Sequence, residues 1–473
     1  MTTTTDIGLI AHLMRRAGFG ASLEELERRS KVGYEATVEE FLHPETQPPF
    51  DDDLLFRYIP YFRMGTGMPS HQGYWMYRMI NTQRPLEEKM TLFWHQVFAT
   101  GYPKLNRNPQ MNKQLNLFRS FAFGNFRTIL IELSRDPAMI FWLDNNENRK
   151  GVPNENYGRE LLELFSMGVG MDDHFNYTED DVKDCARAFT GWTIAPQLPR
   201  YPYGDYLWDF EYRADEHDDS EKSFLGERGR FNGEDIIDII VRQPATARFL
   251  CRHLYNFFVS DEPQVPSWQT TPPNDPSAIE TMVQAYFDSN YEIRPVLRVL
   301  FNSQFFKTSQ YRKVKSPAEL IASVMRLVDD YTSPKPNIHN IADACGYMGQ
   351  DLFNPPTVEG WHTGKEWIDS GALVERINFA ADRVGNLSNP GIKRICERLA
   401  SGGGQYTPEE LVDRCTELAG PVHIQDSSRE GLIAHMARGG AIKCATATEL
   451  SDFNLRVAGL LQMIVSLREY QFS

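Results

Sequence analysis

The sequence has no long apolar run, no visible signal peptide and no excess of positive charge. No stretch approaches the roughly 20 consecutive apolar residues of a membrane-spanning helix, so no membrane span is predicted. The N-terminus lacks a charged segment followed by an apolar one, which predicts a cytoplasmic location and leaves open export by another route or with a partner. With 49 basic and 64 acidic residues, the net charge of −15 argues against nucleic-acid binding, which needs basic patches.

Cysteine is scarce and the common catalytic motifs are missing. The six cysteines include no CxxC pair, which argues against a zinc knuckle or a disulfide framework and predicts reduced core thiols. They are Cys185, Cys251, Cys345, Cys396, Cys415 and Cys444. The sequence also lacks a GxSxG elbow, a Walker A loop, an HExxH helix and a dinucleotide-binding GxGxxG fingerprint.

What the sequence does contain is mainly helical periodicity. Its 41% hydrophobic and 24% charged residues are typical of a soluble globular protein, and alternating β-branched runs are few. We therefore predict an all-α fold: a large multi-helix globular domain with two long irregular loops, at 194–232 and 346–369. Residues 1–310 are predicted to form the main helical domain, and residues 311–473 a C-terminal helical part that packs on it and is not independent. The 194–232 loop is long enough to be functional or a lid.

The densest group of polar residues lies between 144 and 192, and its helix carries Glu160 and Glu163. Three residues apart, the two glutamates share one helix face, where like charges cost stability unless a cation or a shared proton compensates. One interpretation is a metal-binding or acid/base catalytic pair, with Arg159 beside it. The alternative is that one glutamate pairs with Arg159 or Arg187 and the other is solvated.

Two histidines are candidate partners of this acidic face. His95 follows Trp94 on an apolar helix stripe, where a hydrogen-bonded core histidine is an alternative to a metal ligand. Leu92 stands where the Glu-x-x-His spacing of diiron bundles would place a glutamate, which counts against that class of site. His217 precedes Asp218 in the long loop, where the pair could bind a cation or simply be solvated.

The polar loop at 144–155 has a weak resemblance to a calcium-binding loop. Its oxygen-bearing residues are Asp144, Asn146, Asn148 and Glu155, at positions 1, 3, 5 and 12 of such a loop. Arg149 occupies the position that needs glycine for the sharp turn. The alternative is a polar network that fixes the beginning of the next helix.

Several segments resemble, in order, those of a known family. They are HLMRRAGFG at 12–20, RPLEEKMTLFWHQVF at 84–98, SRDPAMIFWLDNNENRKGVPNENYGRELLELFSMGVG at 134–170, YTEDDVKDCARAFTGW at 177–192, HDDSEKSFLG at 217–226, VKSPAEL at 314–320 and MGQDLFNPPTVEGWHTGKEWI at 348–368. The family is the bacterial domain of unknown function 1800. The resemblance implies a large helical protein, often encoded beside a partner family related to alkaline phosphatases and sulfatases. Many members are exported, and this sequence departs from them in lacking a visible signal.

Three functional hypotheses follow. The first is a metal-dependent enzyme, oxidative or hydrolytic, in which Glu160 and Glu163, with His95 or with His217 and Asp218, hold a divalent ion in the helical core under the 194–232 loop. Mixed nitrogen and oxygen ligands suit Fe, Mn or Zn, and calcium would suit the 144–155 loop. The second is a non-catalytic scaffold or partner of a phosphatase/sulfatase-like protein. The third is a carbohydrate-active enzyme with Glu160 or Glu163 as its acid.

Overall fold

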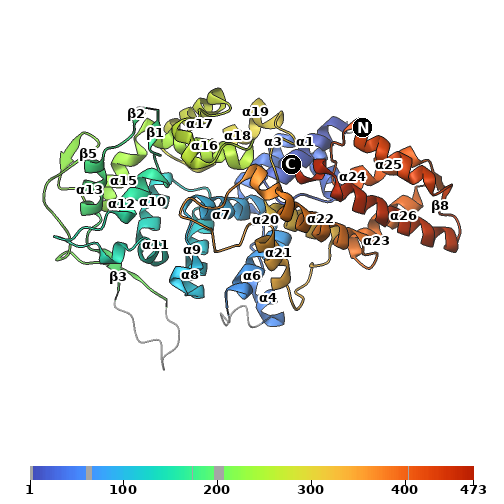
Figure 1. The fold of residues 1–473 in the computed structure, drawn as a ribbon, viewed down its shortest axis with the longest axis horizontal. Helices are drawn as coiled ribbons and strands as arrows, with labels where there is room; N and C mark the ends of the chain where they lie inside the picture. Colours follow the sequence, from blue (N-terminus) through green and yellow to red (C-terminus); the bar gives the residue numbers. More distant parts are fainter. Residues whose placement is uncertain (1–3, 60–66, 173, 196–206, 403) are drawn as a thin grey trace. The chain divides into compact units, whose positions relative to one another are not determined.

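The computed structural model describes residues 4–59, 67–172, 174–195, 207–402 and 404–473 (Figure 1). The chain divides into two compact units. Unit 1 comprises Met1–Glu88, Gln304–Leu352 and His362–Ser473, and unit 2 comprises Lys89–Ser303 and Phe353–Trp361. The division of the sequence near residue 310 stays a prediction. Among the described residues, no helix combines the length and apolar character needed to cross a membrane.

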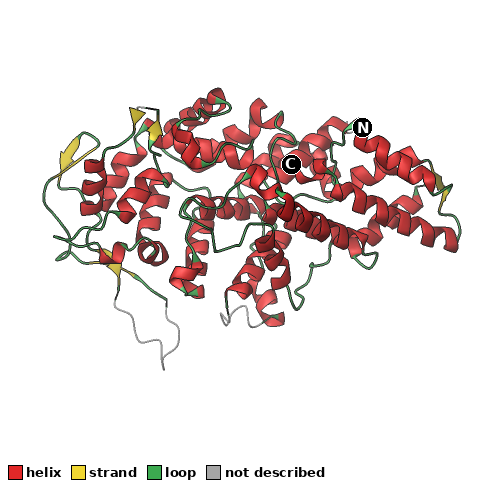
Figure 2. Cartoon of the chain, in the orientation of Figure 1, coloured by secondary structure: helices red, strands yellow, loops and turns green. Residues whose placement is uncertain are grey.

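The described part of unit 1 consists of helices and the short strand pair β7–β8 (Figure 2). Its elements are α1 (Thr4–Arg16), α2 (Leu23–Val32), α3 (Tyr34–Leu42), η1 (Pro44–Thr46), α4 (Asp52–Tyr58), α6 (Met68–Asn81), α19 (Gln304–Lys307), α20 (Pro317–Val328), α21 (His339–Tyr347), η4 (Gly364–Ile368), α22 (Ser370–Gly385), α23 (Pro390–Ser401), β7 (Gln405–Tyr406), α24 (Pro408–Leu418), α25 (Asp426–Arg438), β8 (Ile442–Lys443), α26 (Ala447–Ser466) and η5 (Arg468–Gln471). Within it, α22 packs along α26, and α20 contacts both α6 and α22.

Unit 2 carries the segments that the sequence singles out. Its elements are α7 (Pro85–Val97, which begins in unit 1), α8 (Tyr102–Leu105), α9 (Asn108–Ser120), α10 (Phe126–Arg135), α11 (Pro137–Trp142), η2 (Asn145–Glu147), α12 (Asn156–Glu163), β1 (Gly170–Met171), β2 (His174–Phe175), α13 (Glu179–Ala188), β3 (Trp192–Ile194), β4 (Phe210–Tyr212), β5 (Lys222–Phe224), β6 (Glu227–Gly229), α15 (Gly233–Val241), α16 (Pro244–Phe258), η3 (Val265–Gln269), α17 (Pro276–Asp288) and α18 (Ile293–Asn302). Its strands form antiparallel two-stranded pairs, β1–β2, β3–β4 and β5–β6. The described chain is therefore mostly helical, which confirms the predicted fold class.

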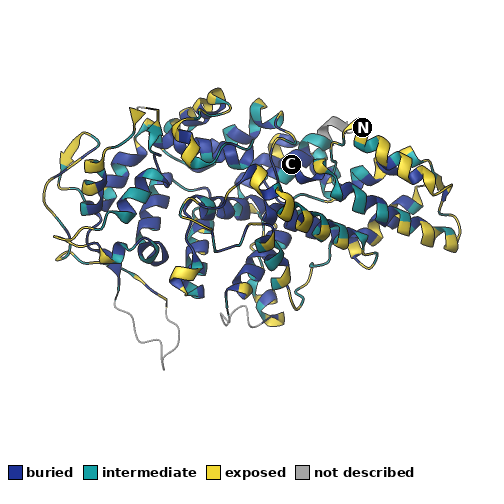
Figure 3. Cartoon of the chain, in the orientation of Figure 1, coloured by how far each residue is buried: buried dark blue, intermediate teal, exposed yellow. Residues whose placement is uncertain are grey.

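Local sequence signals explain where the helices of unit 2 begin and which side they bury. Thr178 and Asp181 form a reciprocal capping box at the beginning of α13. Asp136 caps α11 directly before Pro137. The buried positions of α18, which are Ile293, Val296, Leu297, Leu300 and Phe301, follow the spacing of one helix face. Figure 3 shows the same division into buried and exposed residues along the helices of both units.

The two segments predicted to be irregular contain short regular elements. The described part of 194–232 forms β3–β4 and β5–β6, with Trp208 and Phe210 packed near Ile140 of α11. The prediction of a lid falls partly on residues 196–206, which lie outside the described residues. In the 346–369 segment, which contains η4, Trp361 and Trp367 are both buried.

Candidate functional site

The acidic face predicted on the helix after the polar loop lies on α12. This helix packs against α13 through its buried side, which carries Tyr157, Leu161 and Leu162. Glu160 and Glu163 occupy the partly buried side, one turn apart. The spacing therefore places the two carboxyl groups together, as the sequence predicted.

The arginines near this face bind other carboxylates. Arg159 donates to Glu179 over 2.9 and 2.8 Å and to Glu155 over 3.2 Å. Arg187 donates to Asp218 and to Asp184. Neither guanidinium forms the ion pair with Glu160 or Glu163 that the alternative interpretation required. Within the described parts of the chain, the carboxyl group of neither glutamate has a hydrogen bond or an ion pair.

This arrangement perturbs the ionisation of Glu160. Burial, together with the nearby carboxyl groups of Glu163 and Glu359, raises the pKa of Glu160 to about 7, although Arg159 acts in the opposite direction. Burial and Glu163 also raise the pKa of the Tyr177 hydroxyl. Glu160 thus has a pKa at which a carboxyl group can both accept and release a proton near neutral pH.

Glu163 and Glu359 also line a pocket within unit 2, which we call the α16–α17 pocket. Its volume is about 360 Å³, within the usual range for small-molecule sites. Most of its lining is apolar: Leu164, Met167, Val169, Met171, Phe249, Val265, Pro266, Trp268, Pro273, Pro276 and Ile279. The chain segment after α12, together with α16, η3 and α17, contributes these residues.

Two glycines shape the turn between α12 and this pocket. Gly168 has a φ of +68°, and a Cβ there would lie 2.7 Å from the ring of Phe249. Gly170 has a φ of +122°, and a Cβ there would lie 2.0 Å from the backbone oxygen of His174. Only glycine fits both the backbone conformation and the space at these positions. The GVG sequence after α12 therefore brings the chain against the pocket wall.

Both arginines of the pocket are already paired. Arg248 is 2.6 Å from Glu280. Arg252 is bound by the buried carboxylate of Glu262 at 2.8 Å and lies over the ring of Trp268, 4.4 Å from its centroid. Their positive charges are thus compensated locally.

Glu359 reaches the pocket from a tight turn. Gly360, with a φ of +92°, closes the turn by donating to the backbone oxygen of Thr357 over 3.1 Å. A Cβ on Gly360 would lie 2.4 Å from the backbone oxygen of Gln96 on α7, so the turn sits tightly against that helix. Glu359 was not predicted as a site residue, although it lies in a segment shared with the family. The aromatic side of the pocket, formed by Phe249 and Trp268, was missed as well.

His95 lies in an aromatic environment. Its ring centroid is 5.2 Å from that of Trp361 and 5.7 Å from that of Phe353. Burial lowers the pKa of His95 to about 3, so the imidazole is neutral. Both contacts are with aromatic rings, so His95 is a buried residue of the core, and metal binding by His95 stays a prediction.

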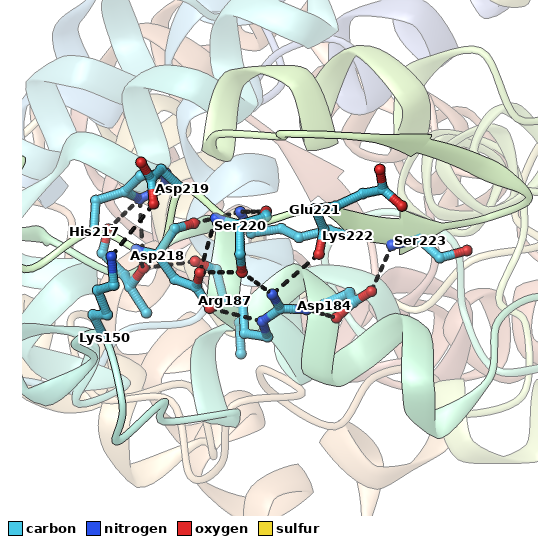
Figure 4. Close-up of polar contacts among 12 residues, drawn as sticks. Lys150, Asp184, Arg187, His217, Asp218, Asp219, Ser220, Glu221, Lys222 and Ser223 are labelled. Atoms are coloured by element: carbon cyan, nitrogen blue, oxygen red, sulfur yellow. Dashed lines mark hydrogen bonds and ion pairs between the residues drawn. The ribbon is translucent and has the colours of Figure 1, made fainter.

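His217 and Asp218 belong to a polar network that fixes residues 217–223 to α13 (Figure 4). The His217 Nδ1 atom lies 2.9 Å from the Thr190 backbone oxygen. Burial acts to raise the pKa of the Asp218 carboxyl group. Hydrogen bonds from Arg187 and Ser220 nevertheless hold this pKa well below its usual range. Lys222 donates to the backbone oxygen of Asp218, which completes the loop.

The 144–155 loop is held by its own amides. The Asn148 side chain donates to the Ala186 backbone oxygen over 2.8 Å and accepts from the Asn154 backbone N–H over 3.0 Å. Asn154 in turn accepts from the backbone N–H of Asn156, the first residue of α12. Asp144 forms an ion pair with Lys104, and Glu155 with Arg159. These bonds are those expected of a network that fixes the beginning of α12.

The predicted site residues therefore fall into separate environments. Glu160 and Glu163 share one helix face beside the pocket, His95 lies among aromatic rings, and Asp218 is bound by Arg187. Across the described ranges, no three His, Cys, Asp or Glu side chains are grouped so that they could hold a metal ion. No described residue of the 194–232 segment lines the pocket.

Comparison with known proteins identifies the family of the chain but assigns no function to it. No curated protein and no solved structure matches the chain. The model of the family described as "Protein of unknown function (DUF1800)" matches residues 12–472. With nearly its whole length matched, the chain belongs to the DUF1800 family.

Proposed function

We propose that the chain is an enzyme that binds a small organic substrate in the α16–α17 pocket and uses Glu160 and Glu163 for proton transfer. The observation that carries the proposal is the pKa of Glu160, raised to about 7 by burial and by Glu163, which lines a pocket of about 360 Å³. An acid or base works best when its pKa lies near the working pH. Glu163 extends this carboxyl pair to the pocket surface.

A metal-dependent enzyme, oxidative or hydrolytic, is the second candidate. It is favoured by the same unpaired carboxyl groups, because a divalent ion such as Fe, Mn or Zn would compensate the mutual repulsion of Glu160, Glu163 and Glu359. To bind a metal ion together, the described side chains would have to move closer to one another. Otherwise, substrate and water would have to complete the coordination of the ion. Calcium binding by the 144–155 loop stays a prediction.

A panel of chromogenic esters, phosphoesters, amides and glycosides tests both candidates. Glu160→Gln is expected to lower any turnover by about 100-fold, in the range of one lost acid/base group. Glu147→Gln is the matched control, because Glu147 is exposed and does not line the pocket. Turnover that survives chelation supports proton transfer by the glutamates alone. Turnover lost on chelation, with stoichiometric metal in the purified protein, supports the metal enzyme. Activity that is unaffected in both Glu160→Gln and Glu163→Gln contradicts both candidates.

A non-catalytic role beside a phosphatase/sulfatase-like protein is a further candidate, suggested by the family resemblance. One observation favours a protein contact: the β1–β2 pair displays Phe175 and Met171, with 71% and 42% of their surfaces exposed. Size-exclusion chromatography of the two proteins together tests it. Co-elution that is lost in Phe175→Ser supports this role, and independent elution of the two wild-type proteins contradicts it.

A further inference from the structure

The charges that line the α16–α17 pocket do not balance. Arg248 is paired with Glu280, and Arg252 with Glu262. Glu163 and Glu359 line the same pocket, and among the described residues the carboxyl group of neither has a hydrogen bond or an ion pair. Once the paired groups are set aside, the pocket presents carboxylate oxygens without a cationic partner. A ligand that buries these carboxylates has to supply the missing positive charge.

The rest of the pocket is suited to an apolar group. Phe249 and Trp268 are 8% and 6% exposed, with ring centroids 5.4 Å apart at 71°, and form a rigid wall. Hydrogen bonding fixes Trp268, because its indole N–H donates to the backbone oxygen of Pro263 over 2.8 Å. Met167 and Ile279 extend the apolar surface and are also buried. The pocket thus combines a preformed aromatic wall with an acidic edge.

We propose that the α16–α17 pocket binds an organic amine. Its ammonium group donates to Glu163 and Glu359, and its apolar body lies against Phe249 and Trp268. A bare divalent ion would leave the apolar wall without a ligand group. An anionic ligand would meet two carboxylates and only arginines that are already paired. This inference rests on the proposed function in that it takes the pocket as the substrate site, and it names the substrate class.

Three probes of similar size and different charge test the inference on the full-length protein. They are 2-phenylethylamine, 2-phenylethanol and 3-phenylpropanoate, measured by calorimetry and ligand-observed NMR at about pH 7.5, where the amine is protonated. We expect the amine to bind about tenfold more tightly than the alcohol, a difference typical of a charge-assisted hydrogen bond. We expect the carboxylate to bind more weakly than either. Equal binding of amine and alcohol, or preference for the carboxylate, overturns the inference.

Variants then locate the binding. Glu163→Gln is expected to lower amine affinity to about that of the alcohol and to leave alcohol binding unchanged. Ala245→Trp, at a partly exposed lining position at the beginning of α16, is expected to fill the pocket and abolish binding of both. Glu147→Gln is the control, and circular dichroism checks the fold of each variant. Amine affinity unchanged in Glu163→Gln overturns the inference, as does binding of Mn²⁺ or Zn²⁺ at Glu163 without amine binding.

The two proposals can fail separately. Amine binding without any Glu160-dependent turnover would support the binding site and contradict the proposed enzyme. Glu160-dependent turnover of neutral or anionic substrates, without amine binding, would support the enzyme and contradict the amine inference.

Discussion

Arg159 is held by Glu179, which accepts two hydrogen bonds of 2.9 and 2.8 Å from its guanidinium. Arg159 directly precedes Glu160 in sequence, yet its charge is largely committed to a carboxylate on α13. Glu160 therefore has only partial electrostatic compensation, and burial raises its pKa to about 7. The ionisation of the candidate site thus depends on an ion pair between two helices.

Removing Glu179 should shift the ionisation of Glu160. In Glu179→Gln, Arg159 loses its charged partner on α13 and can interact more strongly with Glu160, so the pKa of Glu160 should fall below about 7. Carbon-13 NMR titration of the glutamate carboxyl groups measures this directly. Asp180→Asn is the control, because it also removes one acidic charge from α13 but breaks only the ion pair with Lys183. An equal change in the pKa of Glu160 in both variants would contradict the proposed role of Arg159.

The wall of the α16–α17 pocket depends on the absence of a side chain at Gly168. Gly168→Ala should destabilise the protein by more than about 1 kcal/mol, because the new methyl group meets Phe249 at 2.7 Å and the backbone has a positive φ. Gly226→Ala is the matched control, because Gly226 has a φ of +85° and no atom within 4 Å of its Cβ position. Chemical denaturation of both variants separates the steric cost from the backbone cost. Similar destabilisation of Gly168→Ala and Gly226→Ala would show that the Phe249 ring moves aside without a measurable loss of stability.

Some local features of unit 2 can be predicted from the sequence because they depend on short-range chemistry. The helical pattern of α18, the capping box of Thr178 and Asp181 and the helix beginning at Pro137 are all encoded within a few residues. The same holds for the shared face of Glu160 and Glu163. The spacing of two glutamates three residues apart fixes their side of a helix without any tertiary information.

The pocket could not be predicted in this way, because its walls come from distant parts of the chain. Glu163 and Glu359 are almost 200 residues apart in sequence, and nothing in either segment indicates that they line one cavity. The ion-pair partner of Arg159 could not be predicted from the sequence either. Arg159 could have paired with several nearby acids, and only the packing of α12 on α13 selects Glu179. His95 and Asp218 were singled out by residue type, whereas their environments depend on tertiary contacts.

The 144–155 loop offers a direct test of calcium binding against a structural network. In Asn148→Asp the residue gains a charge that calcium would favour but loses the N–H groups that bond to Asn145 and Ala186. The network should therefore weaken, and we expect a loss of about 1–3 kcal/mol of stability, as for a buried acceptor left unpaired. Thermal unfolding with and without millimolar CaCl₂ measures this. A rise in midpoint with calcium that is larger in Asn148→Asp than in the wild type would instead support a calcium site.

Asp136 carries a buried carboxyl group at the beginning of α11. Burial raises its pKa from 3.8 to about 7, although its Oδ2 atom accepts hydrogen bonds from the Met139 backbone N–H at 2.9 Å and from Gln114 at 2.7 Å. Because the folded-state pKa exceeds the unfolded one, folding favours the protonated form. The stabilising contribution is complete below pH 3.8 and is lost as the pH rises through about 7.

The contribution of Asp136 to the free energy of unfolding should therefore fall with pH between about 4 and 7, by at most about 1.4 kcal/mol per pH unit. Asp136→Asn keeps an acceptor oxygen for Met139 and cannot ionise, so it should remove this slope. Glu160 has a raised pKa and contributes with the same sign, so both proteins in the comparison should carry Glu160→Gln. Urea denaturation at a series of pH values gives the two curves. Parallel curves would mean that Asp136 ionises in the folded protein at its ordinary pKa, and that the α11 cap is more accessible to solvent than its 3% exposure indicates.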